Sequence, residues 1–195
     1  MTRSRLTTLT LLSFTFGALA SLATANGNPV LRLHAFAVDL GSTTTPRARA
    51  GTLDIVIERW STPEDVAKLH SVLAEKGADA LLSALQGIKP RTGYIRSSTS
   101  LGWDIHFAQQ IKAADGSQRI VIATDRPMSF WEAVNKPRSA DYAFTLAEVR
   151  LRPDGTGEGK LVPAAKIDFD KETSTLEVEN YSSEPVRLTE VKIEK

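Results

Sequence analysis

Alternation of apolar and polar residues is the sequence feature that most constrains the fold of this chain. In residues 51–60, Leu53, Ile55 and Ile57 share one side of an extended strand, and mostly polar residues occupy the other side. Further strand-like segments occupy residues 31–40, 90–96, 101–111, 118–124, 142–152, 160–168, 175–180 and 186–193. Most connections between these segments are short, which favours antiparallel pairing over a parallel sheet.

One helical insertion interrupts the series of strands. Residues 61–65 read Ser-Thr-Pro-Glu-Asp, which is typical of a helix start, because a hydroxyl can cap the first N–H groups and proline suits the first turn. Apolar residues then recur at helical spacing, and Gly77 and Gly87 are predicted to end two successive helices. We therefore predict a helical hairpin at about residues 62–87 within an α+β, mainly β fold of eight or nine antiparallel strands. The pattern leaves open whether the strands form a rolled sheet, a barrel or a sandwich.

Residues 1–25 have the three parts of a secretory signal peptide. Arg3 and Arg5 form a basic start, an uncharged apolar run follows, and small residues end the segment at Ala25. We expect cleavage after Ala25, which leaves residues 26–195 as a single domain of a secreted or periplasmic protein without a transmembrane span. An uncleaved N-terminal anchor is the alternative. A lipid anchor on cysteine is excluded, because the sequence contains no cysteine.

The charge balance does not favour nucleic acid as a partner. The whole chain has a formal net charge of +1, but removal of Arg3 and Arg5 lowers the basic residues from 24 to 22, against 23 acidic residues. The sequence also has no block of five or six basic residues. The absence of cysteine further excludes thiol catalysis and cysteine-ligated zinc, and we predict no cofactor.

Residues 119–132 combine an apolar strand with a turn that contains charged and aromatic side chains. After the run that ends at Thr124, Pro127 breaks the strand, and residues 129–132 (Ser-Phe-Trp-Glu) match a helix capping box that presents Phe130 and Trp131. We expect any functional site to lie near residues 125–132. The competing interpretation is that this junction plugs one end of the sheet.

Four segments of the chain resemble a group of short secreted bacterial proteins of unknown function. The segments are residues 51–62 (GTLDIVIERWST), 93–108 (GYIRSSTSLGWDIHFA), 119–133 (RIVIATDRPMSFWEA) and 179–192 (ENYSSEPVRLTEVK). The resemblance covers nearly the whole chain after residue 25. It implies export and one mainly β domain, but it assigns no activity and no catalytic residue.

A second group of candidates consists of charged residues and one tyrosine at the predicted strand ends or in adjoining turns. Its members are Glu58, Arg59, Tyr94, Arg96, Asp125, Arg126, Glu132 and Arg138. Clustered arginines can bind a carboxylate or phosphate, but ion pairs that fasten turns to a sheet are the commoner arrangement. Asp125 with Glu132, or Asp54 with Glu58, can also be interpreted as an acid/base pair of a hydrolase.

Aromatic and histidine residues have a functional and a structural interpretation. Tyr94, Trp103, Phe130 and Trp131, together with Trp60 and Phe107, can line an apolar ligand pocket or form ordinary core. No two of the three histidines have a ligand spacing on one predicted element, so no metal site is predicted.

The sequence contains no motif that defines a reaction, including the GxSxG of serine hydrolases. We therefore interpret the chain as an exported binding or interaction module of the bacterial envelope, whose partner is a small molecule or an envelope protein. The alternatives are a hydrolase-like enzyme with an ionic site near Asp125 and Arg126, and a passive structural component of the envelope.

Overall fold

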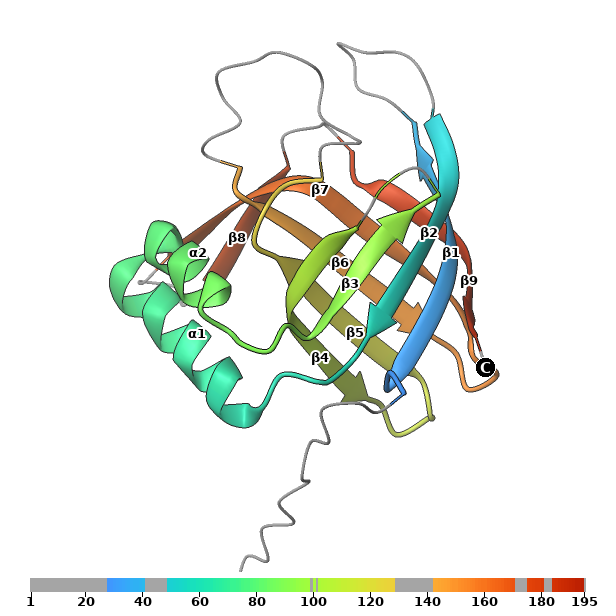
Figure 1. Ribbon diagram of the computed structural model, residues 1–195, viewed down its shortest axis with the longest axis horizontal. Coiled ribbons are helices and arrows are strands. Elements are labelled where there is room, and N and C mark those ends of the chain that lie inside the picture. The colour runs from blue at the N-terminus through green and yellow to red at the C-terminus, as the bar shows by residue number, and fades with distance from the viewer. Residues whose placement is uncertain are drawn as a thin grey trace, which may run out of the picture.

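Nine strands and two helices make up the described part of the chain (Figure 1). The computed structural model describes residues 28–40, 49–98, 100, 102–128, 142–170, 175–180 and 184–194. The strands are β1 (Leu31–Asp39), β2 (Arg49–Ile57), β3 (Gly93–Ser97), β4 (Trp103–Lys112), β5 (Gln118–Thr124), β6 (Phe144–Leu151), β7 (Thr156–Asp170), β8 (Thr175–Asn180) and β9 (Val186–Ile193). The helices are α1 (Pro63–Lys76) and α2 (Ala78–Gln86).

Eight of these strands form a closed antiparallel barrel. The strands β1 to β6 are neighbours in chain order, and β6 pairs with β7. β9 lies between β7 and β1 and completes the ring. β8 is the ninth strand and adds to residues 165–170 of β7, outside the ring. The predicted α+β, mainly β class is confirmed, and the structure decides for a barrel over a sandwich or an open rolled sheet.

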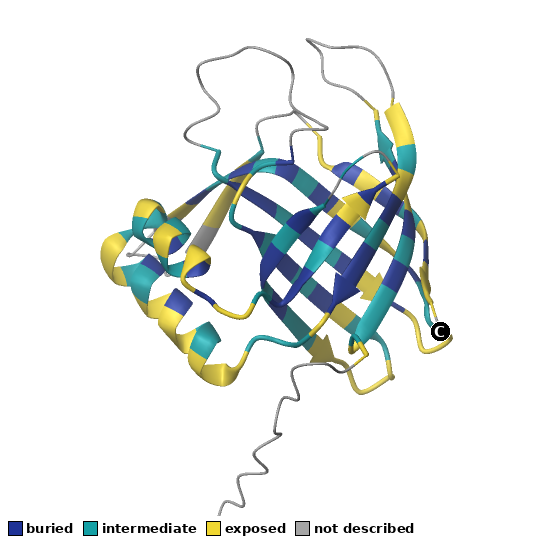
Figure 2. Ribbon diagram, viewed as in Figure 1, coloured by how far each residue is buried: buried dark blue, intermediate teal, exposed yellow. Residues whose placement is uncertain are grey.

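The barrel interior is filled with apolar side chains. Leu33, Ile55, Ile105, Ile120 and Ile122 have no solvent-accessible surface, so no water-sized space adjoins them. An eight-stranded barrel has an interior just wide enough for side chains to fill. Figure 2 shows the corresponding alternation of buried and more exposed residues along the strands.

The two helices pack on the outside of the barrel and form a second apolar core there. Leu69 and Leu73 of α1 and Leu81 and Leu85 of α2 belong to one buried cluster with residues of β4, β5, β6 and β7. Thr62 caps α1 in a reciprocal box with Asp65. The predicted hairpin at about residues 62–87 is therefore confirmed. No helix in the described ranges has the length and apolar character that a membrane span needs.

A β-bulge in β4 changes the expected orientation of Phe107. The alternation in the sequence places Trp103, Ile105 and Phe107 on one face. The pairing of β4 with β5 shifts between Ile105 and Phe107, so His106 is an extra residue in the ladder. Trp103 and Ile105 therefore belong to the barrel core, whereas Phe107 packs in the cluster under the helices. A shift of one residue reverses the face of every side chain that follows.

Residues 125–128 are tied to β6 and β7 by hydrogen bonds. The Thr124 hydroxyl donates to the Arg126 carbonyl oxygen at 2.6 Å, and the Met128 N–H donates to the Pro163 carbonyl oxygen at 2.9 Å. The Thr145 hydroxyl lies 3.1 Å from the first of these oxygens and 2.8 Å from the second. Met128 itself is fully buried in the barrel core. The plug interpretation stays a prediction, because Phe130, Trp131, Glu132 and Arg138 lie outside the described residues.

Close approach of β3 to β2 at Gly93 predicts that two glycine substitutions differ in their effect on stability. A Cβ at Gly93 would collide with the Val56 carbonyl oxygen, whereas a Cβ at Gly51 meets nothing within 4 Å. We expect Gly93→Ala to lower the free energy of unfolding by about 2 kcal/mol or more, which is the usual scale of overpacking. Gly51→Ala is the matched control and should change it by less than about 1 kcal/mol. Urea denaturation of both variants measures the difference, and equal midpoints would contradict the strand pairing.

Candidate functional site

The predicted site residues separate into several places on the barrel. Glu58, Tyr94 and Arg96 come together on the outer wall formed by β2, β3 and β4. Arg59 forms an ion pair with Asp65 at the start of α1, with 3.2 Å between Nη1 and Oδ2. Arg126 donates from Nη2 to the Gly102 carbonyl oxygen at 3.0 Å.

Strand register brings outward-facing polar residues into two adjoining rows. In the first row, His34 of β1 lies opposite Asp54 of β2, which in turn lies opposite Arg96 of β3. In the second row, Tyr94 of β3 lies opposite Asp104 of β4. Directly opposed side chains on one face of a sheet are close enough to interact. The two rows therefore form one continuous polar surface across four strands.

Arg91 contacts residues of this surface through both charged and aromatic partners. It was not among the candidate residues predicted from the sequence. Its guanidinium donates from Nε and Nη2 to both Glu58 carboxylate oxygens, at 3.1 and 2.9 Å, and from Nη1 to Asp104 Oδ1 at 2.6 Å. The hydrogen bonds to Glu58 raise the pKa of Arg91 above its usual value. The same guanidinium carbon lies 5.0 Å from the centre of the Tyr94 ring, and that of Arg96 lies 6.0 Å from it. Tyr94 is thus held by two cation–π contacts.

Asp54 is the central residue of the first row, between His34 and Arg96. Its Oδ1 lies 2.9 Å from His34 Nδ1, and its Oδ2 accepts from Arg96 Nε at 3.1 Å. Partial burial raises the pKa of Asp54, but the hydrogen bonds with His34 and Arg96 together outweigh it and hold the pKa below the usual 3.8. Glu194, which follows β9, brings its Oε1 to 3.9 Å from the same His34 nitrogen.

We call this surface the outer charged face. It consists of His34, Asp54, Glu58, Arg91, Tyr94, Arg96, Asp104 and Glu194. Most of its charged side chains are between a third and a half exposed, so they are ordered by their partners and still reach solvent.

An acid/base role for Asp54 and Glu58 has little geometric support. Both oxygens of Glu58 accept hydrogen bonds from Arg91, and both oxygens of Asp54 contact His34 or Arg96. A glycosidase-type pair needs one carboxyl to donate a proton and the other to face a water or a sugar carbon. With all four oxygens engaged by side chains, neither residue is free for these tasks.

Asp125 pairs with a buried histidine at the bulge of β4. Its Oδ2 lies 3.6 Å from His106 Nε2, and His106 Nδ1 lies 3.3 Å from the Ile88 carbonyl oxygen. A catalytic histidine needs one ring nitrogen directed at a nucleophile or a substrate. Here both nitrogens face protein groups, so the pair fastens the loop after α2 and the end of β5 to the bulge.

The other aromatic and histidine candidates lie in separate environments. Trp103 is 5% exposed within the barrel core, and Trp60 packs against that core. His34, His106 and the exposed His70 of α1 are on three different elements, and the first two have different partners. No local pattern marks Arg91 or Glu194, because their partners Glu58 and His34 are distant from them in the chain.

Comparison of the chain with protein-family models, with curated proteins and with solved structures finds no significant match. The resemblance to short secreted bacterial proteins therefore remains a prediction. The class that the fold defines is a closed eight-stranded antiparallel barrel with one additional strand and an external helical hairpin.

The lowered pKa of Asp54 predicts a pH dependence with a definite sign. Because the pKa of the folded state lies below 3.8, the ion pairs of Asp54 stabilise the protein fully above pH 3.8, and this stabilisation is lost as the pH falls through the folded-state pKa. We expect Arg96→Ala to raise the pKa of Asp54, since one of its charged donors is removed. A carbon-detected NMR titration in metal-free buffer measures this pKa.

Asp115 provides the internal control in the same spectra. Its pKa is also lowered, but by the hydroxyl and the backbone N–H of Ser117 in the β4–β5 turn. The Asp115 pKa should therefore be the same in wild type and in Arg96→Ala. An Asp54 pKa that is also unchanged would contradict the ion pair.

Proposed function

We propose that this protein is an exported binding module that recognises an envelope protein through the outer charged face. The observation that carries the proposal is the contrast between the two surfaces of the barrel wall. The interior is filled with aliphatic side chains, and the outer wall of β1 to β4 presents ordered charged and aromatic groups.

The filled interior makes an enclosed small-molecule ligand the weaker interpretation. Barrels of eight strands bind a ligand only when their interior leaves space for it. In this barrel Ile55, Ile105 and Ile122 have no accessible surface, and Trp103 packs among them. Recognition on the outside of the wall is the arrangement that agrees with this packing.

The composition of the outer charged face favours a protein partner. Tyrosine and arginine are enriched among the residues that dominate protein–protein binding energy. Here Tyr94 is held between Arg91 and Arg96, so little rotamer freedom remains to be lost on binding. Export to the periplasm or the medium is proposed from the signal-like residues 1–25.

Substitutions on the outer charged face test this proposal. The purified wild-type protein, immobilised and exposed to envelope extract of its host, should retain a partner that native mass spectrometry identifies as a stoichiometric complex. Tyr94→Ala and Arg91→Ala should each weaken binding of that partner by about ten-fold or more, which is the scale of interface hot spots. Binding is measured by surface plasmon resonance.

Arg150→Ala is the matched control, because Arg150 is an exposed arginine paired with Glu148 on the wall at β6. It should bind the partner as wild type does. Equal binding by Tyr94→Ala, Arg91→Ala and Arg150→Ala would contradict recognition by the outer charged face. Failure to find any stoichiometric partner would instead favour the passive structural role.

A further inference from the structure

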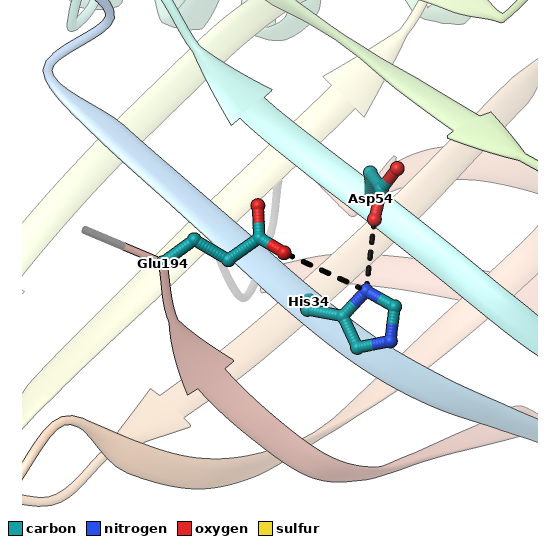
Figure 3. A group of neighbouring side chains, drawn as sticks. All are labelled: His34, Asp54 and Glu194. Carbon is teal, nitrogen blue, oxygen red and sulfur yellow. Dashed lines mark hydrogen bonds and ion pairs between the residues drawn. The ribbon is translucent and has the colours of Figure 1, made fainter.

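Three potential metal ligands converge at one end of the outer charged face. His34 comes from β1, Asp54 from β2, and Glu194 directly follows β9. Figure 3 shows the imidazole directed toward both carboxylates, with the two dashed lines meeting at a single ring nitrogen. One nitrogen and two oxygens thus surround a common point within a span of 4.8 Å.

We propose that His34, Asp54 and Glu194 form a surface site for a divalent transition-metal ion of the Zn²⁺ type. Bonds of about 2.0–2.2 Å in a tetrahedral site place the ligand atoms about 3.3–3.6 Å apart. The His34 Nδ1 atom lies 2.9 Å from Asp54 Oδ1 and 3.9 Å from Glu194 Oε1. These two distances bracket the tetrahedral value, and the three ligand atoms all lie within 4.8 Å of one another, so the side chains must close in around the ion when it binds.

The types of ligand atom determine which metal ions the site prefers. Mg²⁺ and Ca²⁺ prefer shells made only of oxygen ligands, whereas an imidazole nitrogen favours Zn²⁺, Ni²⁺ or Cu²⁺. Two carboxylates offset the charge of a divalent ion, and the ion takes the place of the proton that His34 Nδ1 shares with Asp54. The three side chains are 30–49% exposed, so water can complete the coordination shell.

The surrounding structure holds two of the ligands in place. Arg96 donates to Asp54 Oδ2 and so turns Oδ1 toward His34, in the way that outer hydrogen bonds orient ligating carboxylates. The backbone N–H of Glu194 donates to the Arg32 carbonyl oxygen at 3.0 Å, which fixes the end of β9 beside β1. The site therefore depends on the pairing of β9 with β1, which brings residues from the two ends of the chain together.

Zn²⁺ titration of the purified protein tests this site. Isothermal titration calorimetry of protein free of any histidine tag, dialysed against chelator and then buffer, should show one Zn²⁺ bound per chain and no comparable binding of Mg²⁺. His34→Asn and Glu194→Gln should each weaken Zn²⁺ binding by about ten-fold or more, because each removes a ligand. Both side chains are partly exposed, so the substitutions should leave the fold intact, which circular dichroism of each variant checks.

His70→Asn and Glu190→Gln are the matched controls, because they make the same chemical changes at exposed positions of α1 and β9. Both should bind Zn²⁺ with wild-type affinity. Absence of Zn²⁺ binding by the wild type, or equal affinity in His34→Asn, Glu194→Gln and the controls, overturns the proposal. The result is independent of partner recognition, because the titration contains no partner and the partner assay uses Tyr94 and Arg91, which are not ligands.

Discussion

The pairing of β7 on both of its edges is the constraint on which the rest of the structure depends. The first half of β7 pairs with β6 on one side and with β9 on the other, and these two ladders close the ring. Close approach is required here, because a Cβ at Gly157 or Gly159 would collide with the backbone oxygen of Arg150 or Glu148. Without this closure, β6 and β9 would leave unpaired edges.

Closure also divides the molecule into surfaces with different roles. The inside becomes an apolar core, and the apolar outer wall of β4 to β7 is covered by α1 and α2, as Figure 1 shows. The strands on the other side, from β9 through β1 and β2 to β3, face away from the helices. That is where the polar rows lie, so burial of the apolar wall leaves the charged wall for recognition.

The two proposed activities use opposite ends of one surface. Arg91, Tyr94 and Asp104 form the end near β4, where aromatic contacts and paired charges suit a protein partner. His34 and Glu194 form the end near β9, where an imidazole and a carboxylate suit a metal ion. Asp54 and Arg96 lie between them and couple the two ends through one ion pair.

The sequence by itself determined the strands, the helical hairpin and the buried face of β2, because alternation and helix capping are local properties that neighbouring residues report directly. Closure of the barrel, the bulge at His106 and the meeting of His34, Asp54 and Glu194 were decided only by the tertiary structure. Each depends on the register between paired strands, whether these are distant in the chain, like β1 and β9, or consecutive, like β4 and β5. Local periodicity carries no information about that register. The same reason explains why the sequence alone does not identify Arg91. Its partners are Asp104 of β4 and Glu58, which directly follows β2.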